Sequence, residues 1–166
     1  MRRLNLGVVG CGDIAGYTAL LSRLIPQIRL AACCDVNPDC AEAFSRRHRI
    51  PCKTTAYESL LQRDDVQAVY LAVPHDLHYG MILAAVEAGK PVLVEKPLVR
   101  TLAEGRDLIA RIGNHKVGVN YQYRYDRGCY QLHKAVRSGA LGRVYSVRIN
   151  IPWHRSESYF SSSPWH

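Results

Sequence analysis

Three small residues near the N-terminus have the spacing of a phosphate-binding turn. Gly10, Gly12 and Ala15 follow an apolar run and open a segment with helical periodicity. Gly10 permits a tight turn, and Gly12 lets a pyrophosphate approach the backbone, where a helix N-terminus offers free N–H groups and a positive dipole. This context favours dinucleotide binding over the plainer interpretation, an ordinary turn at the end of a strand.

The acidic Asp35 is the second element of this pattern, because it ends the next apolar run along the chain. A carboxylate there accepts hydrogen bonds from the hydroxyls of an adenosine ribose and repels the 2′-phosphate of NADP. The residues that follow, Val36 and Asn37, are not basic. We therefore predict NAD as the cofactor in preference to NADP. Arg46 and Arg47 leave an alternative open: they favour NADP if they reach the same pocket, although a solvated helix face also explains them.

A lysine follows another apolar run, from Pro91 to Val94, in the tripeptide Glu95-Lys96-Pro97. The carboxyl ends of parallel strands border the ligand crevice of an open α/β sheet. Lys96 at such an end can hydrogen-bond a substrate hydroxyl and stabilise the alkoxide that develops as hydride leaves its carbon. Position alone supports a surface Glu–Lys pair before a turn equally well.

Short apolar runs alternate with helical segments over the first 120 residues. We expect strands at residues 4–9, 28–34, 66–73, 91–94 and 116–119, with a short one near 53, and helices at 13–25, 37–48, 77–88 and 101–113. An Asn-Pro pair and a capping box mark the starts of the second and fourth helices. Apolar strands joined by crossover helices predict a doubly wound, Rossmann-type parallel sheet, an α/β fold, over residues 1–120.

The pattern changes after residue 120. An aromatic connector precedes an expected helix at 126–138, and residues 144–153 alternate apolar and polar side chains, which predicts an antiparallel strand with one covered face. One helix and one strand cannot bury that apolar face. We therefore interpret residues 121–166 as the incomplete start of an α+β substrate and oligomerisation domain, and we expect a homo-oligomer.

Composition excludes several classes of protein. The 166 residues carry a net charge of +8, but the basic residues are scattered and accompany no nucleic-acid motif, so we expect no nucleic-acid partner. The chain has no apolar run long enough to span a membrane and no secretory signal, so we expect a cytoplasmic protein without a membrane partner. The six cysteines lack metal-ligand spacing, so we expect reduced thiols and no metal.

Further along, the chain resembles the Gfo/Idh/MocA family of oxidoreductases. The resemblance lies in the segments 72–78 (AVPHDLH) and 87–97 (EAGKPVLVEKP), with later landmarks at 120–125 (NYQYRY) and 138–144 (SGALGRV). It implies transfer of hydride between nicotinamide and a secondary hydroxyl of a sugar, sugar acid or cyclitol. Family members continue further and contribute a histidine that accepts the proton, so we expect the 166 residues alone to be inactive.

The resemblance also implies roles for individual residues. It assigns the pyrophosphate to Gly10, Gly12, Asp13 and Ile14, the adenosine ribose to Asp35, the wall of the dinucleotide groove to Val73, Pro74 and His78, and the nicotinamide end to Glu95 and Lys96. Lys96 is the implied catalytic residue, and Arg124 and Arg155 are assigned with it to the substrate. A non-catalytic NAD-binding module is the alternative function, and a basic nucleic-acid binder is a third.

Overall fold

A six-stranded parallel sheet forms the centre of the first part of the chain. The structure, a computed structural model, describes residues 3–161, and the chain divides into two compact units after Asn120. The strands are β1 (Leu4–Val9), β2 (Ile28–Cys34), β3 (Cys52–Thr54), β4 (Ala68–Leu71), β5 (Val92–Glu95) and β6 (Val117–Asn120). Their order is β3-β2-β1-β4-β5-β6, and all pairs are parallel. This order confirms the predicted doubly wound sheet and puts its switch point between β1 and β4.

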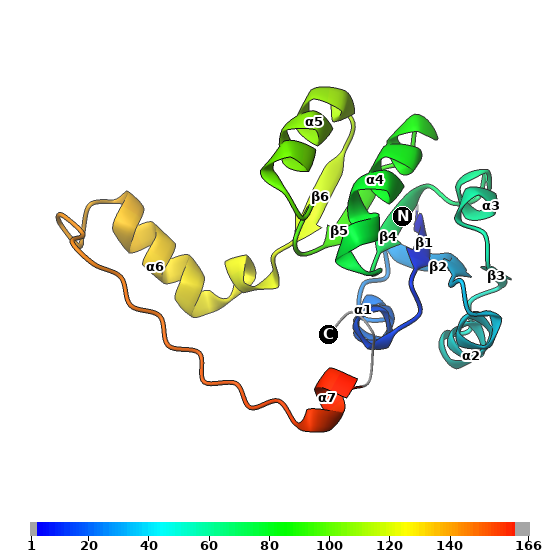
Figure 1. Cartoon of the computed structure of the whole chain (residues 1–166), viewed down its shortest axis with the longest axis horizontal. Coiled ribbons are helices and arrows are strands. Elements are labelled where there is room, and N and C mark those ends of the chain that lie inside the picture. The colour runs from blue at the N-terminus through cyan, green and yellow to red at the C-terminus, as the bar shows by residue number, and fades with distance from the viewer. Residues whose placement is uncertain (1–2, 162–166) are drawn as a thin grey trace. The chain divides into compact units, whose positions relative to one another are not determined.

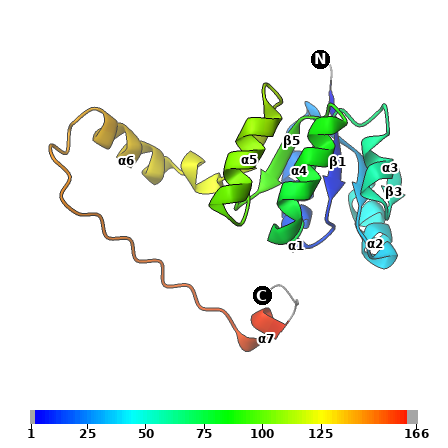
Figure 2. The same cartoon turned by 45° about the horizontal axis from the view of Figure 1, so that its top comes forward.

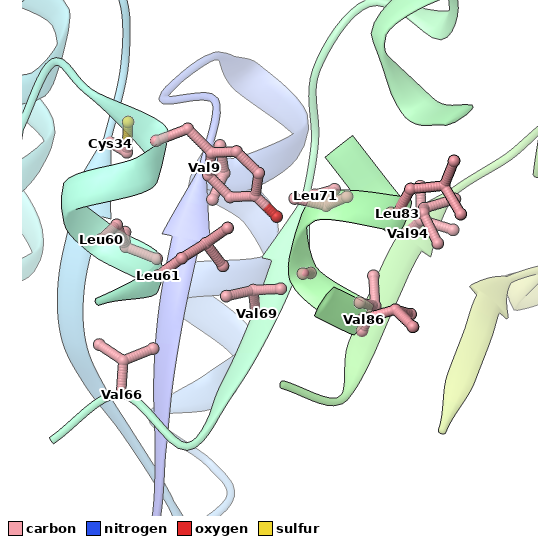
Figure 3. Close-up of a cluster of buried hydrophobic side chains, with 14 of the residues drawn as sticks. Val9, Cys34, Leu60, Leu61, Val66, Val69, Leu71, Leu83, Val86 and Val94 are labelled. Carbon is pink, nitrogen blue, oxygen red and sulfur yellow. The ribbon is translucent and has the colours of Figure 1, made fainter. Parts of the chain in front are cut away.

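Helices cover both faces of the sheet (Figure 1). They are α1 (Asp13–Ser22), α2 (Pro38–His48), α3 (Tyr57–Leu61), α4 (His78–Glu87) and α5 (Leu102–Ile112). In Figures 1 and 2, α1 and α2 lie on one face and α3, α4 and α5 on the other. Each face has its own apolar cluster, because neighbouring strand residues point to opposite faces. In β2, Cys33 belongs to the α1–α2 cluster, whereas Cys34 belongs to the α3–α5 cluster shown in Figure 3.

The caps expected from the sequence are present. The Asn37 side chain accepts a hydrogen bond from the N–H of Asp39 at 2.9 Å, and Thr101 and Glu104 form a reciprocal capping box.

Two elements of the first unit differ from expectation. The helix over residues 57–61 was not predicted, although Tyr57 and Leu60 are buried, because five residues show too little periodicity. The strand expected at 66–73 is shorter than predicted and comprises only β4, because the chain leaves the sheet after Leu71 and continues as a loop.

The second unit contains η2 (Gln122–Tyr125), α6 (Arg127–Arg137) and α7 (Glu157–Ser161). The strand expected over residues 144–153 is not formed, so that prediction is wrong for this chain (Figure 1). A strand needs a neighbour for its backbone hydrogen bonds, and the described residues of this unit contain no other strand. The alternating apolar side chains therefore remain exposed, for example Ile149 at 75% and Trp153 at 62%.

No helix among residues 3–161 is long and apolar enough to cross a membrane.

Candidate functional site

The predicted site residues of the first unit gather at one edge of the sheet. Gly10 follows β1, Asp35 follows β2, Val73 follows β4 and Lys96 follows β5. Because these strands are parallel, their carboxyl ends meet at the same edge, on both sides of the switch point. An open α/β sheet binds its ligand in the crevice at this place.

Gly10 and Gly12 have different structural reasons to be glycine. Gly10 has a φ of +83°, and a Cβ atom there would lie 2.2 Å from the carbonyl oxygen of Ala72. Gly12 is the N-cap of α1 and caps the helix without a side-chain hydrogen bond, and a Cβ atom at this position would meet no heavy atom within 4 Å. The backbone at Gly12 is therefore open to the approach of a ligand, next to the first N–H groups of α1, which lack partners within the helix. This cradle fits the pyrophosphate of a dinucleotide.

Asp35 is anchored beside this turn by its own hydrogen bonds. One carboxylate oxygen accepts from the N–H of Cys11 at 2.8 Å, and the other accepts from the N–H of Asn37 at 2.9 Å. A carboxylate has about four acceptor positions, so two are still available for ribose hydroxyls. Asp35 thus links the glycine turn to the end of β2 and keeps capacity for a ligand.

His78 lies beside the loop that carries Val73 and Pro74, and its assignment to the wall of the dinucleotide groove stays a prediction. The side chain is fully buried, and its ring nitrogens lie 3.0 Å from the carbonyl oxygen of Val73 and 2.7 Å from that of Pro97. Its ring lies between the loops that follow β4 and β5, and a neutral ring donates its single N–H to one of these two carbonyl oxygens. Val73 and Pro74 remain in the loop at the crevice, and Val73 lies next to Gly10.

Glu95 is held by a buried polar network that the sequence analysis missed. The hydroxyl of Tyr70, a fully buried residue of β4, donates to the Glu95 carboxylate at 2.5 Å. Asn120 on β6 donates to the same oxygen at 2.7 Å, and Thr18 on α1 donates to the Tyr70 hydroxyl at 3.0 Å. Burial and the neighbouring Glu95 raise the pKa of Tyr70.

This network holds the Glu95 side chain in place, and the assignment of Glu95 to the nicotinamide end stays a prediction. Its carboxylate oxygen is occupied by Tyr70 and Asn120, and only 9% of the residue is exposed. Four elements, α1, β4, β5 and β6, are thereby tied together directly before Lys96. The alternation of side chains along β4 could have placed Tyr70 on one buried face of the sheet. The neighbouring residues in the sequence do not identify Glu95 as the partner of its hydroxyl.

Lys96 is exposed at the end of β5 and has a histidine nearby. Burial lowers the pKa of His75, and the adjacent His78 and Lys96 lower it further. The His75 ring packs edge-on against His78, with 5.6 Å between ring centroids. The crevice edge therefore carries an exposed ammonium group beside a histidine that favours its neutral form.

The two arginines assigned to the substrate lie in the second unit. The Arg124 guanidinium lies over the Tyr121 ring at 5.7 Å, and that of Arg155 lies over the Trp153 and Tyr159 rings at 4.5 Å and 4.8 Å. Both are cation–π contacts within a few residues along the chain. Their assignment to a substrate stays a prediction.

Comparison with known proteins agrees with this geometry. Residues 4–123 match the sequence profile of the Gfo/Idh/MocA family, described as an oxidoreductase family with an NAD-binding Rossmann fold. The chain belongs to this family. An inositol 2-dehydrogenase of Rubrobacter xylanophilus is 32% identical over 158 residues, covering 93% of this chain and 44% of that protein.

Two solved structures are also similar. The WlbA dehydrogenase of Chromobacterium violaceum, in complex with NADH and UDP-GlcNAcA, has a TM-score of 0.92 and 26% identity, covering 99% of this chain and 48% of that one. KijD10, a 3-ketoreductase of Actinomadura kijaniata in complex with NADP, has a TM-score of 0.76 and 30% identity, covering 83% and 43%. The family member described here thus spans about half the length of the curated relatives it matches.

Proposed function

We propose that this chain is the cofactor-binding part of an NAD-dependent dehydrogenase that acts on a secondary hydroxyl of a sugar, sugar acid or cyclitol. The observation that carries the proposal is the juxtaposition, at one sheet edge, of the open N-terminus of α1 and the exposed Lys96. Relatives named for inositol and for a UDP-sugar acid support the substrate class.

Each residue at the edge has a defined task in this proposal. The α1 N-terminus with Gly12 holds the pyrophosphate, and Asp35 holds the adenosine ribose. Bound nicotinamide supplies the acceptor or donor for hydride. Lys96 would donate a hydrogen bond to the substrate oxygen and stabilise its developing negative charge while a separate proton acceptor takes the hydroxyl proton. Glu95 and Tyr70 keep the end of β5 in place.

The preference for NAD over NADP rests on Asp35 and on the position of the nearby arginines. Arg46 and Arg47 lie in the last turn of α2, whereas Asp35 adjoins its first turn. Nine residues of helix separate Pro38 from Arg47, a rise of about 14 Å. Arg46 and Arg47 therefore lie at the opposite end of α2 from Asp35. In the proposal, Asp35 is the charged group next to the adenosine ribose, which favours NAD.

Titration with NADH and NADPH, followed by cofactor fluorescence, tests this preference. We expect NADH to bind at least tenfold more tightly, since a second negative charge meets Asp35. Asp35→Asn is expected to reduce the discrimination, and the matched control Asp39→Asn to leave it unchanged. Tighter binding of NADPH by the unaltered chain would contradict the assignment.

We further propose that the 166 residues bind cofactor without turnover. Hydride transfer needs an oriented substrate and a positioned proton acceptor as well as Lys96. A panel of sugars, sugar acids and inositols, monitored for NADH formation, is expected to show none. Steady turnover would refute this. In a version extended to the length of the relatives, Lys96→Met should abolish most turnover, and near-normal turnover would refute the role of Lys96. An unaltered extended version without any turnover would favour the alternative of a non-catalytic NAD-binding module.

A cytoplasmic location is part of the same proposal. All six cysteines of the chain are free thiols in the structure, which suits a reducing compartment.

A further inference from the structure

A second concave region lies between α1 and α2. An open cavity of about 420 Å³ runs along the two helices, and a neighbouring one of about 290 Å³ lies beside the start of β2. Arg23 and His48 line both cavities, Arg47 lines the first, and Arg29 and Arg49 line the second. These residues lie at the C-terminal ends of α1 and α2 and at the amino end of β2, the sheet edge opposite to the proposed cofactor crevice.

The positive charge around these cavities is largely uncompensated. Among residues 3–161, none of the four arginines at positions 23, 29, 47 and 49 forms an ion pair within 4.0 Å. The Asp65 carboxylate is attracted by Arg29 but is bound by Arg63 at 2.9 Å. The C-terminal dipoles of α1 and α2 contribute about half a negative charge each, which offsets about one of the four positive charges.

His48 adds an unusual feature to the same place. Both of its ring nitrogens are buried, and neither has a hydrogen-bond partner among the described residues. Burial lowers the pKa of His48, and the charges of Arg23 and Arg47 lower it further, so the ring favours its neutral form. Unpaired buried groups of this kind are rare in folded proteins and call for an explanation. His48 lines both cavities, and its ring packs against Phe44 with 4.5 Å between the ring centroids, so a ligand bound in the cavities is a candidate for the missing partner.

From this geometry we infer that the basic end of the α1–α2 cavity is an anion-binding site for a small phosphorylated organic molecule. The opposite end of the same cavity reaches Cys11 and Gly12 of the glycine turn, so the inferred site adjoins the proposed dinucleotide crevice. The phosphate binds Arg23, Arg47 and the His48 N–H, because guanidinium groups and an N–H donor match its oxygens. The organic part lies along Tyr17 and Leu20, which line the first cavity between its basic end and the α1 N-terminus.

The volume of the first cavity favours a small molecule over a polymer. Sites for small molecules and cofactors commonly occupy about 300–1,000 Å³ and are concave, which the α1–α2 cavity matches. Nucleic acid instead requires a basic stripe along an exposed surface.

Phenyl phosphate and inorganic phosphate are suitable probes, with sodium chloride at equal ionic strength as the background. We expect saturable binding of phenyl phosphate by the full 166-residue chain, with NMR shifts in residues 19–24 and 44–50. Arg23→Gln and Arg47→Gln should each weaken binding about tenfold through loss of a charge-assisted hydrogen bond. The matched control Arg106→Gln removes an exposed arginine of α5 and should have no effect.

His48→Leu separates a binding role from a structural one. This variant removes the two unpaired nitrogens, so its urea midpoint should rise while phenyl phosphate binding weakens. NADH affinity should stay unchanged in all four variants, so a failure of the proposed cofactor function would be recognised separately.

Four results would overturn the inference. The first is NMR shifts confined to residues 10–14, which would place the anion in the glycine turn. The second is equal weakening of binding by Arg106→Gln, and the third is the absence of saturable binding. The fourth is tighter and steeply salt-dependent binding of a short oligonucleotide through the same arginines.

Discussion

The buried Glu95 carboxylate lies directly before the exposed Lys96 in the sequence. The hydrogen bonds of Glu95 therefore determine how rigidly the end of β5 is positioned. A buried carboxylate needs donors, since burying a charge without partners is costly. Tyr70 and Asn120 supply two donors to one oxygen. The position of Lys96 therefore depends on residues of three neighbouring strands, although none of them needs to touch a ligand.

Replacing Tyr70 tests the strength of this network. Tyr70→Phe keeps the buried ring but removes a donor to Glu95, so we expect the free energy of unfolding to fall by about 2–3 kcal/mol, as for a hydrogen bond to a charged group. The control is Tyr57→Phe, which removes a bond from a buried hydroxyl to the carbonyl oxygen of Met81 and should cost about 1 kcal/mol. Urea denaturation measures both. If both variants lost the same free energy of unfolding, the bond from Tyr70 to Glu95 would be no stronger than an ordinary bond from a hydroxyl to a carbonyl oxygen.

Histidine protonation gives a second prediction at this scale. Burial lowers the pKa of His48 and of His75 in the folded chain, whereas an unfolded histidine titrates near pH 6.5. The unfolded state therefore binds more protons just below that pH, so stability should decrease as the pH falls through about 6.5.

Urea midpoints between pH 8 and pH 5.5 measure this slope. The double variant His48→Gln/His75→Gln should flatten it below pH 6.5, and above pH 7.5 neither chain should show a slope from these groups. An unchanged slope in the variant would refute the attribution to the two histidines.

At the scale of elements, the turn between β1 and α1 combines a folding requirement with a binding requirement. Gly10 is enclosed by Ala72 and Val73 of the neighbouring crevice loop and has a positive φ. Gly12 has ordinary extended backbone angles and open space beside it. The two glycines therefore respond to the same substitution in different ways.

Alanine at each position should separate the two requirements. Gly10→Ala is expected to cost about 3 kcal/mol of stability or more, because its Cβ would collide with the Ala72 carbonyl oxygen and its φ is unfavourable. Gly12→Ala should change stability little but weaken NADH binding at least tenfold, since the added methyl lies where the pyrophosphate must approach. Thermal unfolding and NADH titration measure the pair. A Gly12→Ala chain with unaltered NADH affinity would place the pyrophosphate elsewhere.

At the scale of the whole molecule, apolar side chains are exposed in the described part of the second unit. Leu132 and Val136 of α6 are 56% and 50% exposed, and the side chains at 145, 147, 149, 151 and 153 are 62–85% exposed. Exposed apolar surface of this kind favours association.

We expect the isolated chain to self-associate, with residues 144–153 pairing as strands between copies. Light scattering measures the mass. Ile149→Lys together with Ile151→Lys should shift the chain toward monomer without changing NADH affinity, because both positions lie outside the first unit. A chain that is monomeric at all accessible concentrations would contradict the expectation.

The sequence by itself determined the α/β class, the sheet edge of the site, the glycine turn, Asp35 and the placement of Lys96. These features depend on local patterns: apolar strands, helix caps, and a parallel arrangement that brings strand ends together. Residues 144–153 show the limit of such patterns, because alternation predicts a strand only when a partner strand exists.

Only the tertiary structure decided which side chains meet. Tyr70 and Asn120 are far from Glu95 along the chain, yet both donate to its carboxylate, and Thr18 donates to the Tyr70 hydroxyl, because β4, β5, β6 and α1 are neighbours in space. His78 proved to be buried between two loops, a position that depends on how the turns after β4 and β5 pack. Such contacts are set by the arrangement of separate elements, and local spacing carries no information about them.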